Sequence, residues 1–216
     1  LQVFFNEAVF SKNDGSGALD SSDFSFSLAG GEATLTKNFP TTISGSGTKV
    51  LSLGVLLTGN PNGEEVLTVN PKASAVYDGR GNVTKATQSN NTIQLTDKLL
   101  PFFTGGALTP SNTSVSVTFN EKVYAKNNAT GSLEVTDFEL SVTGGTATIK
   151  NSTPDSVGIV GNTYSLGVSL EGLPSGSETL TVKPKSSAIF DGTGNNASTT
   201  QNFSTYTLND KLPPSV

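Results

Sequence analysis

The side chains that could carry out chemistry in this sequence are its 18 aspartate and glutamate residues, because histidine and cysteine are both absent. Carboxylates alone support two kinds of site: oxygen ligands for a hard cation such as Ca²⁺, or a general acid and base flanking a glycosidic bond. A Ser-His or Cys-His nucleophile pair, a thiolate or imidazole zinc site and a disulfide framework are all excluded. A formal net charge of −5 and a single arginine, Arg80, argue against nucleic acid as a partner.

The acids recur along the chain because the sequence is duplicated. Phe5-Asn6-Glu7 returns as Phe119-Asn120-Glu121 at an offset of 114 residues, and Asp78-Gly79 returns as Asp191-Gly192 at an offset of 113. A period of this length is too long for a solenoid, whose units run roughly 20 to 50 residues, so each copy is expected to be a complete domain. The predicted domains are residues 1–99 and 100–216.

The elements that must position the acids are predicted to be strands. Apolar and polar residues alternate with a period of two, and clusters of Gly, Asn, Pro and Ser interrupt the alternation roughly every eight to twelve residues. This pattern predicts an all-β fold, with two tandem immunoglobulin-like Greek-key β-sandwich domains. The alternating residues include Val115, Val117 and Phe119; Phe138, Leu140 and Val142; Leu180 and Val182; and Leu67 and Val69. The strands expected in the second copy are 101–108, 115–124, 136–143, 146–150, 157–169, 177–183, 187–190 and 200–208, with equivalents in the first.

Several short motifs carry a resemblance to a known family. Leu67-Thr68-Val69 leads to Asp78-Gly79, and Leu95-Thr96-Asp97 precedes Pro101-Phe102, which resembles the last strands and linker of a cadherin repeat. The whole unit is similar to the bacterial-type Ig-like and cadherin-like repeats of large extracellular surface and filament proteins. The resemblance implies a cadherin-like sandwich that is non-catalytic, forms rods outside the cell and often binds calcium. The linker departs from the cadherin pattern, because Lys-Leu-Leu follows Asp97 where that family has Asn-Asp-Asn.

Six positions hold an acid in both copies, and most of them are candidate calcium ligands, because calcium accepts six to eight oxygen ligands at loop ends. The matched pairs are Glu7/Glu121, Asp20/Glu134, Asp23/Asp137, Glu65/Glu178, Asp78/Asp191 and Asp97/Asp210. Stacking of the copies is expected to bring Glu7, Asp20, Asp23 and Asp97 toward Asp191. Glu121, Glu134, Asp137 and Asp210 are then expected to face a following repeat, and Asp78 a preceding one. The alternative is that the two Asp-Gly sequences simply form turns.

The duplication favours a structural function over catalysis. Two copies of a catalytic cleft in domains this small, without histidine or tryptophan, are not expected, so we predict that the protein is not an enzyme. The prediction is a structural or adhesive repeat module of an extracellular surface protein or filament, rigidified by calcium, whose partners are further copies of the repeat or subunit. The alternative is a binding module that uses loops at a domain tip to hold a protein or cell-surface or matrix glycans. The sequence contains no run of 18 apolar residues, so we do not expect membrane insertion.

The two copies differ at their first strand. The first copy starts at the equivalent of Val115, so it has no counterpart of residues 101–108. We expect an open groove at that place, and an unpaired strand edge is a template for strand addition. One interpretation is that a neighbouring subunit donates Pro213 to Val216, with any residues beyond them, and so builds a filament. The other interpretation is simple truncation of a longer chain.

Overall fold

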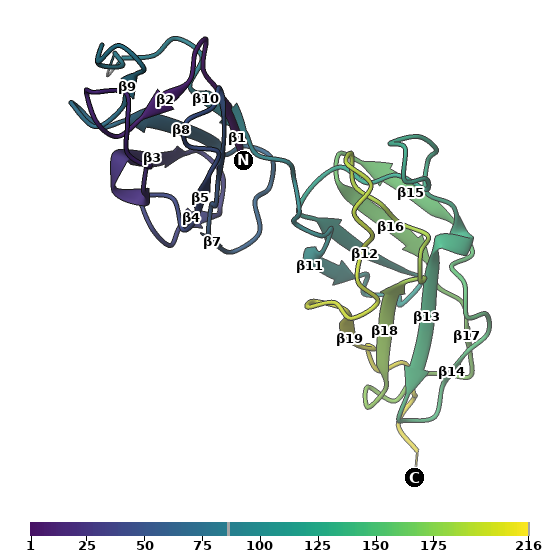
Figure 1. Ribbon diagram of the computed structural model, residues 1–216. Helices are drawn as coiled ribbons and strands as arrows, with labels where there is room; N and C mark the ends of the chain where they lie inside the picture. Colours follow the sequence, from purple (N-terminus) through teal and green to yellow (C-terminus); the bar gives the residue numbers. More distant parts are fainter. Residues whose placement is uncertain (86, 216) are drawn as a thin grey trace. The chain divides into compact units, whose positions relative to one another are not determined.

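The computed structural model describes residues 1–85 and 87–215 and confirms the all-β fold. Figure 1 shows the chain, which divides into two compact units, Leu1–Leu99 and Leu100–Val216. Val216, the last residue of the predicted donor segment, lies outside the described residues. Within the described part of the chain, no helix has the length and apolar character needed to cross a membrane.

The first unit is built from small antiparallel sheets. One sheet has the strand order β1-β6-β5 and another has the order β10-β8-β3, and the pairs β2-β9 and β4-β7 complete the unit. The strands are β1 (Gln2–Phe4), β2 (Val9–Phe10), β3 (Phe24–Ala29), β4 (Thr34–Leu35), β5 (Ile43–Ser44), β6 (Val50–Leu53), β7 (Leu57–Thr58), β8 (Val66–Pro71), β9 (Tyr77–Asp78) and β10 (Thr92–Gln94). A 3₁₀ helix, η1 (Ser21–Asp23), precedes β3.

The second unit repeats this plan and adds a strand at its start. Its sheets have the orders β11-β12-β16-β15 and β13-β18-β19, with the pair β14-β17 beside them. The strands are β11 (Phe103–Leu108), β12 (Ser114–Phe119), β13 (Phe138–Thr143), β14 (Thr148–Ile149), β15 (Val157–Val160), β16 (Thr163–Gly167), β17 (Leu170–Glu171), β18 (Thr179–Pro184) and β19 (Thr205–Thr207). The helix η2 (Val135–Asp137) precedes β13 as η1 precedes β3.

The predicted alternation places side chains in the core of each unit. Along β12 the buried residues are Val115, Val117 and Phe119, with half-buried polar residues between them. The same alternation buries Leu67 and Val69 on β8. Burying every second side chain of a strand removes apolar surface from water, which is the main force that holds such a sheet to its core.

Three of the expected strands differ in kind or extent, and the strand expected over 200–208 is limited to β19 (Thr205–Thr207). The segment expected as one strand over 157–169 is a hairpin of β15 and β16, because Gly161 turns the chain at a φ of +61°. Ser187 has a φ of +56°, so the strand expected over 187–190 is reduced to bridges at Phe190. The strand expected over 115–124 ends at Phe119, after which the chain turns toward Phe190.

A buried glutamate closes one end of each sheet. Glu65 has an exposed fraction of 0%, and its Oε1 accepts hydrogen bonds from the backbone N–H groups of Glu32 and Ala33, each at 2.9 Å. Its Oε2 accepts from the N–H groups of Asn62 at 3.0 Å and Gly63 at 3.2 Å. The carboxylate therefore ties the turn that follows β3 to the loop that precedes β8.

Glu178 does the same in the second unit. Its exposed fraction is also 0%, and it accepts from the N–H groups of Thr146 at 2.6 Å, Ala147 at 3.0 Å and Ser175 at 2.9 Å. Burial alone raises the pKa of both glutamates, but the backbone donors together outweigh it and hold the pKa of Glu65 and Glu178 below the ordinary value. Each side chain is thus a buried anion that backbone dipoles stabilise.

The turn beside each glutamate has no room for a side chain. A Cβ atom at Gly31 would lie 2.1 Å from Glu65 Cδ, and one at Gly145 would lie 2.0 Å from Glu178 Oε1. Both glycines also have positive φ, +62° and +58°. The matched Gly-Gly sequences are therefore required by the approach of the carboxylate as well as by the turn.

Gly145→Ala is expected to destabilise the protein far more than Gly161→Ala. The two glycines have nearly equal φ, +58° and +61°, but no atom lies within 4 Å of a Cβ at Gly161. Backbone strain should cost about 1 kcal/mol at either position, and displacement of the carboxylate should add roughly 2 kcal/mol or more at Gly145 only. Urea unfolding of both variants measures this difference. Equal losses would mean that the carboxylate contact contributes nothing.

Glu178→Gln is expected to lower the free energy of unfolding at pH 7, because an amide NH₂ cannot accept the backbone donors. The folded-state pKa of Glu178 is depressed, so its contribution is complete above the unfolded-state value of about 4.3 and declines as the pH falls below it. The gap between the parent protein and this variant should shrink in acid, as measured by urea unfolding from pH 7 to pH 3. Glu171→Gln, at an exposed position on β17, is the control. A gap that stays constant over this range would contradict the assignment.

Candidate metal site

The Asp-Gly sequences form tight loops around their own aspartates. Asp191 Oδ1 accepts from the N–H groups of Thr193 and Asn195, both at 2.8 Å, and Asn195 Nδ2 donates to Asp191 Oδ2 at 2.7 Å. Asp78 makes the same bonds to Arg80 N, Asn82 N and Asn82 Nδ2. The side-chain bond from Asn82, with the backbone donors, lowers the pKa of Asp78. Both Asp-Gly sequences therefore form turns in which the aspartate side chain accepts the backbone N–H groups of its own loop.

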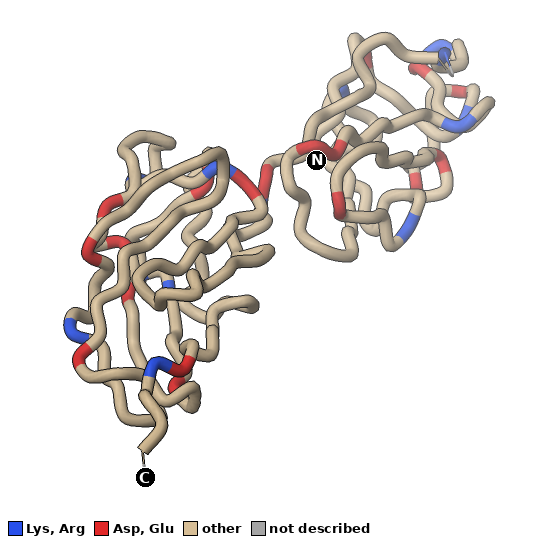
Figure 2. The backbone as a smooth tube through the Cα atoms, turned by 180° about the vertical axis from the view of Figure 1, so that it is seen from behind, with Lys and Arg blue, Asp and Glu red and all other residues tan. Residues whose placement is uncertain are grey.

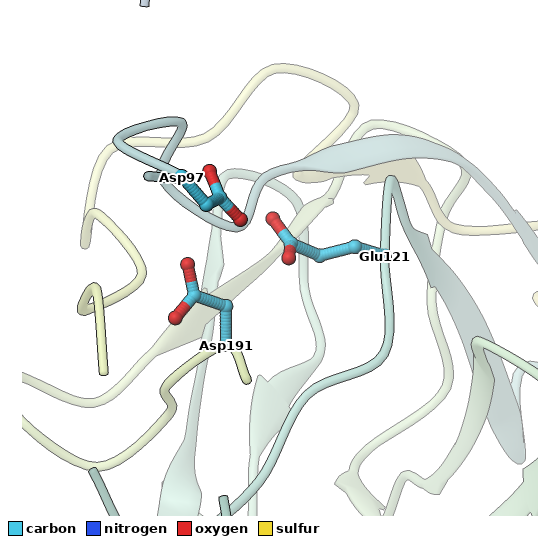
Figure 3. Close-up of side chains that lie close together, drawn as sticks. All are labelled: Asp97, Glu121 and Asp191. Carbon is cyan, nitrogen blue, oxygen red and sulfur yellow. The ribbon is translucent and has the colours of Figure 1, made fainter. Parts of the chain in front are cut away.

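Glu121 lies beside Asp191 in the second unit. Their carboxylate oxygens are within 4.8 Å of one another, and Figure 3 shows the two carboxylates approaching from different loops. The approach follows from local pairing, because Tyr124 N donates to Phe190 O at 2.7 Å and Phe190 N donates to Tyr124 O at 2.8 Å. Asn120 Nδ2 also donates to Glu121 Oε1 at 3.1 Å. Two carboxylates at this spacing are the hard oxygen donors that Ca²⁺ prefers.

Asp97, which Figure 3 also draws, is held by the first unit. Its Oδ1 accepts from Leu99 N at 2.8 Å, and the N–H groups of Lys98 and Leu99 donate to Pro61 O. Asp210 has the same local contacts in the second unit, with Leu212 N as donor at 2.8 Å and Lys211 N bonded to Pro174 O. Both aspartates therefore lie beside the loop whose N–H groups donate to the buried glutamate.

The acids before β3 and β13 cap the short helices. Asp23 Oδ2 accepts from Asp20 N at 2.8 Å, and Asp137 Oδ2 accepts from Glu134 N at 2.7 Å. Asp20 in turn accepts from Ser22 N, which is an N-cap bond. Partial burial raises the pKa of Asp23 and Asp137 above the ordinary value. The side chains of Asp20, Asp23 and Asp137 therefore already stabilise the backbone at the start of each short helix.

The structure does not place at one end of the first unit the acids that the sequence predicted to lie together there, toward Asp191. Asp20 and Asp23 precede β3, whereas β3 ends at Ala29 opposite Val66, next to the loop that holds Asp97. A strand of six residues separates the two ends by roughly 17 Å. The expectation that Asp20 and Asp23 lie with Asp97 was therefore wrong, because β3 carries the chain away from them.

The other expected groupings are corrected in the same way. Glu7 lies two residues before Val9, which pairs with Asp78, so it belongs near that loop and not near Asp97. Glu121 lies with Asp191, although the sequence analysis placed the two at opposite ends of the domain. Glu134 and Asp137 precede β13, at the end of that strand opposite Asp210. Figure 2 shows that the acids of each unit are distributed over several of its loops.

Sequence reasoning did not assign a role to Glu65 and Glu178, although both were among the matched acids. The signal that could have identified them is that each copy also has a Gly-Gly sequence at a matched position, Gly30-Gly31 and Gly144-Gly145. Glycine with positive φ beside a buried carboxylate provides the N–H donors that an anion needs.

No protein-family model, curated protein or solved structure matches this chain. The functional interpretation therefore depends on the duplicated architecture and on the use that the structure makes of its acids.

Proposed function

We propose that the chain is a pair of tandem immunoglobulin-like, cadherin-like repeats that act without catalysis as a structural or adhesive module of an extracellular surface protein or filament. The observation that carries this proposal is that the acids repeated in both units have structural roles. Both units keep a buried glutamate, an aspartate-centred loop and a capped 3₁₀ helix before the same strand. What is repeated is a scaffold, as a protein made of linked domains requires.

The hydrogen bonds of the acids support a non-catalytic role. A general acid or base needs a carboxyl that can exchange its proton with a substrate. Here Glu178 and Asp191 have exposed fractions of 0%, and backbone N–H groups hold their oxygens. Carboxylates bound in this way stabilise loops, and loops of fixed shape suit the end of a domain that must join another.

Calcium is the cation that we propose for the Glu121 and Asp191 pair. The carboxylate oxygens of Glu121 and Asp191 lie within 4.8 Å of one another on loops of the same compact unit, and residues with hydroxyl and amide oxygens are abundant in the sequence nearby. Asp97, in the segment that leads into the second unit, is a further ligand predicted from the sequence. Bound Ca²⁺ would offset the repulsion between the carboxylates and stabilise the folded state.

Calcium is expected to raise the melting temperature in a saturable way relative to EDTA. At 100 times the dissociation constant, a site specific to the native state contributes about 2.7 kcal/mol. Glu121→Gln should abolish the increase, whereas Glu139→Gln, which removes the same charge from an exposed position on β13, should retain it. Asp97→Asn tests the sequence prediction for the linker. The same calcium response in the Glu121 and Glu139 variants would exclude a site at this pair.

The spacer role predicts that each unit resists force independently. In single-molecule stretching, the chain should unfold in two events that each release roughly 30 to 40 nm, since an extended residue spans about 3.6 Å. Gly145→Ala should weaken one event and leave the other unchanged, because it alters the second unit alone. A single cooperative event, or unfolding without measurable resistance, would contradict a mechanical function.

One feature favours a second candidate function, a module that binds a protein or a glycan through loops at a domain tip. The β15–β16 hairpin exposes Ile159 at 60% and Val160 at 83%. Beside it lies a hollow of about 480 Å³ lined by residues that include Lys122, Tyr124 and Asn162. Specific retention of a glycan by the parent protein, lost on Val160→Ser, would favour this function over the spacer role.

A further inference from the structure

Strand β15 forms one edge of its sheet. The strand order is β11-β12-β16-β15, so β15 pairs with β16 on one side only (Figure 1). Among residues 1–85 and 87–215, no strand pairs with its outer side. Two of its side chains are apolar and exposed, Ile159 at 60% and Val160 at 83%. An edge strand with unpaired backbone groups and exposed apolar side chains is a template for another strand.

The hydrogen bonds of β16 determine which of its residues bond to β15. The carbonyl of Asn162, just before β16, accepts from Phe119 N at 3.0 Å, so this residue bonds toward β12. Successive residues of an antiparallel strand bond to alternate sides. Thr163 and Ser165 therefore bond toward β15.

The same alternation determines which backbone groups of β15 are free to bond outward. The residues opposite Thr163 and Ser165 are Val160 and Gly158, so these two use their N–H and C=O groups within the sheet. The N–H and C=O groups of Val157 and Ile159 then point away from β16. Two residues with the same orientation, two positions apart, are what a further antiparallel strand requires.

The side chains of Val157 and Ile159 lie on the core-facing side of the sheet. They lie opposite Leu166 and Tyr164, whose exposed fractions are 0% and 3%. Val157 packs against the hydrophobic core, and Ile159 lines the hollow of about 480 Å³ at the hairpin. An added strand with apolar side chains on this side would extend the buried face of the sheet.

The opposite face of the sheet is polar but uncharged near this edge. Hydroxyl groups meet there across the strands, with 2.9 Å between the Oγ atoms of Ser114 and Ser165 and 2.9 Å between the Oγ1 atoms of Thr118 and Thr163. The segment 156–163 contains no charged residue. Because like charges on facing strands destabilise a sheet, an edge without charge can lie against an identical edge.

The equivalent hairpin of the first unit has a different sequence and different contacts. By the repeat, Gly45-Ser46 occupies the positions of Ile159-Val160. The first-unit hairpin also bonds to the segment after β1, because Gly47 N donates to Val9 O at 2.9 Å. The exposed apolar hairpin is therefore a feature of the second unit that the repeat does not share.

We propose that β15 pairs antiparallel with β15 of a second copy of this chain, about a two-fold axis at Gly158. In this register Val157 lies opposite the partner's Ile159, and each of the two such pairs exchanges both N–H···O bonds. Gly158 faces the partner's Gly158, so no side chains collide at the axis. The edge is complementary to itself in its bonds, its apolar pairs and its lack of charge, which is why a second copy is the occupant.

This inference rests on the proposed function and deepens it, because it names the surface through which chains adhere to one another. The strand has only four residues, so a single pairing belongs to the weak interfaces that bury less than about 1,200 Å². Chains with several such modules would add many weak pairings, which together give strong adhesion.

The first test is sedimentation equilibrium of the full 216-residue chain. It should show a monomer–dimer equilibrium that salt strengthens, because each copy has a net charge of −5. Ile159→Pro removes an outward N–H without removing a bond to β16, as an edge strand tolerates. It should weaken the dimer at least about tenfold, since the symmetric pair loses two donors.

A pair of lysine variants controls for the place of association. Ile159→Lys puts a charge against the partner's Val157 and should also weaken the dimer at least about tenfold. Leu173→Lys replaces an apolar residue that is 53% exposed outside β15, and it should leave the dimer unchanged. Melting temperatures close to that of the parent protein would show that both variants are folded.

The second test traps the register with cysteine, which the chain otherwise lacks. A Cβ atom at Gly158 would meet only ordinary contacts, the nearest at 3.9 Å, so Gly158→Cys should fold. Across the axis the two Cα atoms should lie about 4.5 Å apart, which suits a disulfide. Mild oxidation should therefore give a covalent dimer. Ser165→Cys, one strand further in, should not crosslink, because its counterpart would lie about 14 Å away.

Hydrogen exchange provides an independent measurement of the pairing. The amides of Val157 and Ile159 should become protected as the protein concentration rises, whereas the amide of Gly158 is already bonded within the sheet. A chain that stays monomeric, a dimer that both Ile159 variants leave intact, or equal crosslinking at 158 and 165 would overturn the proposal. Single-molecule stretching uses isolated chains, so these failures would leave the spacer role standing.

Discussion

Each unit is closed by a carboxylate that has no exposed surface and that backbone N–H groups hold. Such an anion is tolerated only where its donors are fixed, because an unpaired buried charge is costly. The donors come from a turn after one strand and a loop before its partner, so Glu65 and Glu178 determine where β3 and β13 end. The linker residues that follow bond to this same loop, through Pro61 and Pro174. The exit of the chain from each unit thus depends on one buried side chain.

Much of the strand arrangement could be predicted from the sequence, because alternation reports burial directly. Val115, Val117 and Phe119 are buried as their spacing indicates. Strand boundaries are less predictable where a non-glycine residue has a positive φ, as at Ser187, because its residue type does not indicate that conformation. The buried glutamates are hard to recognise without the matched Gly-Gly sequences, since an isolated acid in a sequence is usually exposed, and the donors in the turn after β3 or β13 lie about thirty residues away in the chain.

The candidate site shows the same limit. Residue types alone indicated calcium ligands, but their grouping depends on which end of a strand each residue occupies. The bridge between Tyr124 and Phe190 brings Glu121 to Asp191, whereas β3 carries the chain away from Asp23 toward the loop that holds Asp97. Strand direction, more than composition, therefore decides which carboxylates can share a cation. The capping and loop bonds that occupy many of the remaining acids explain why they recur in both copies without converging on one site.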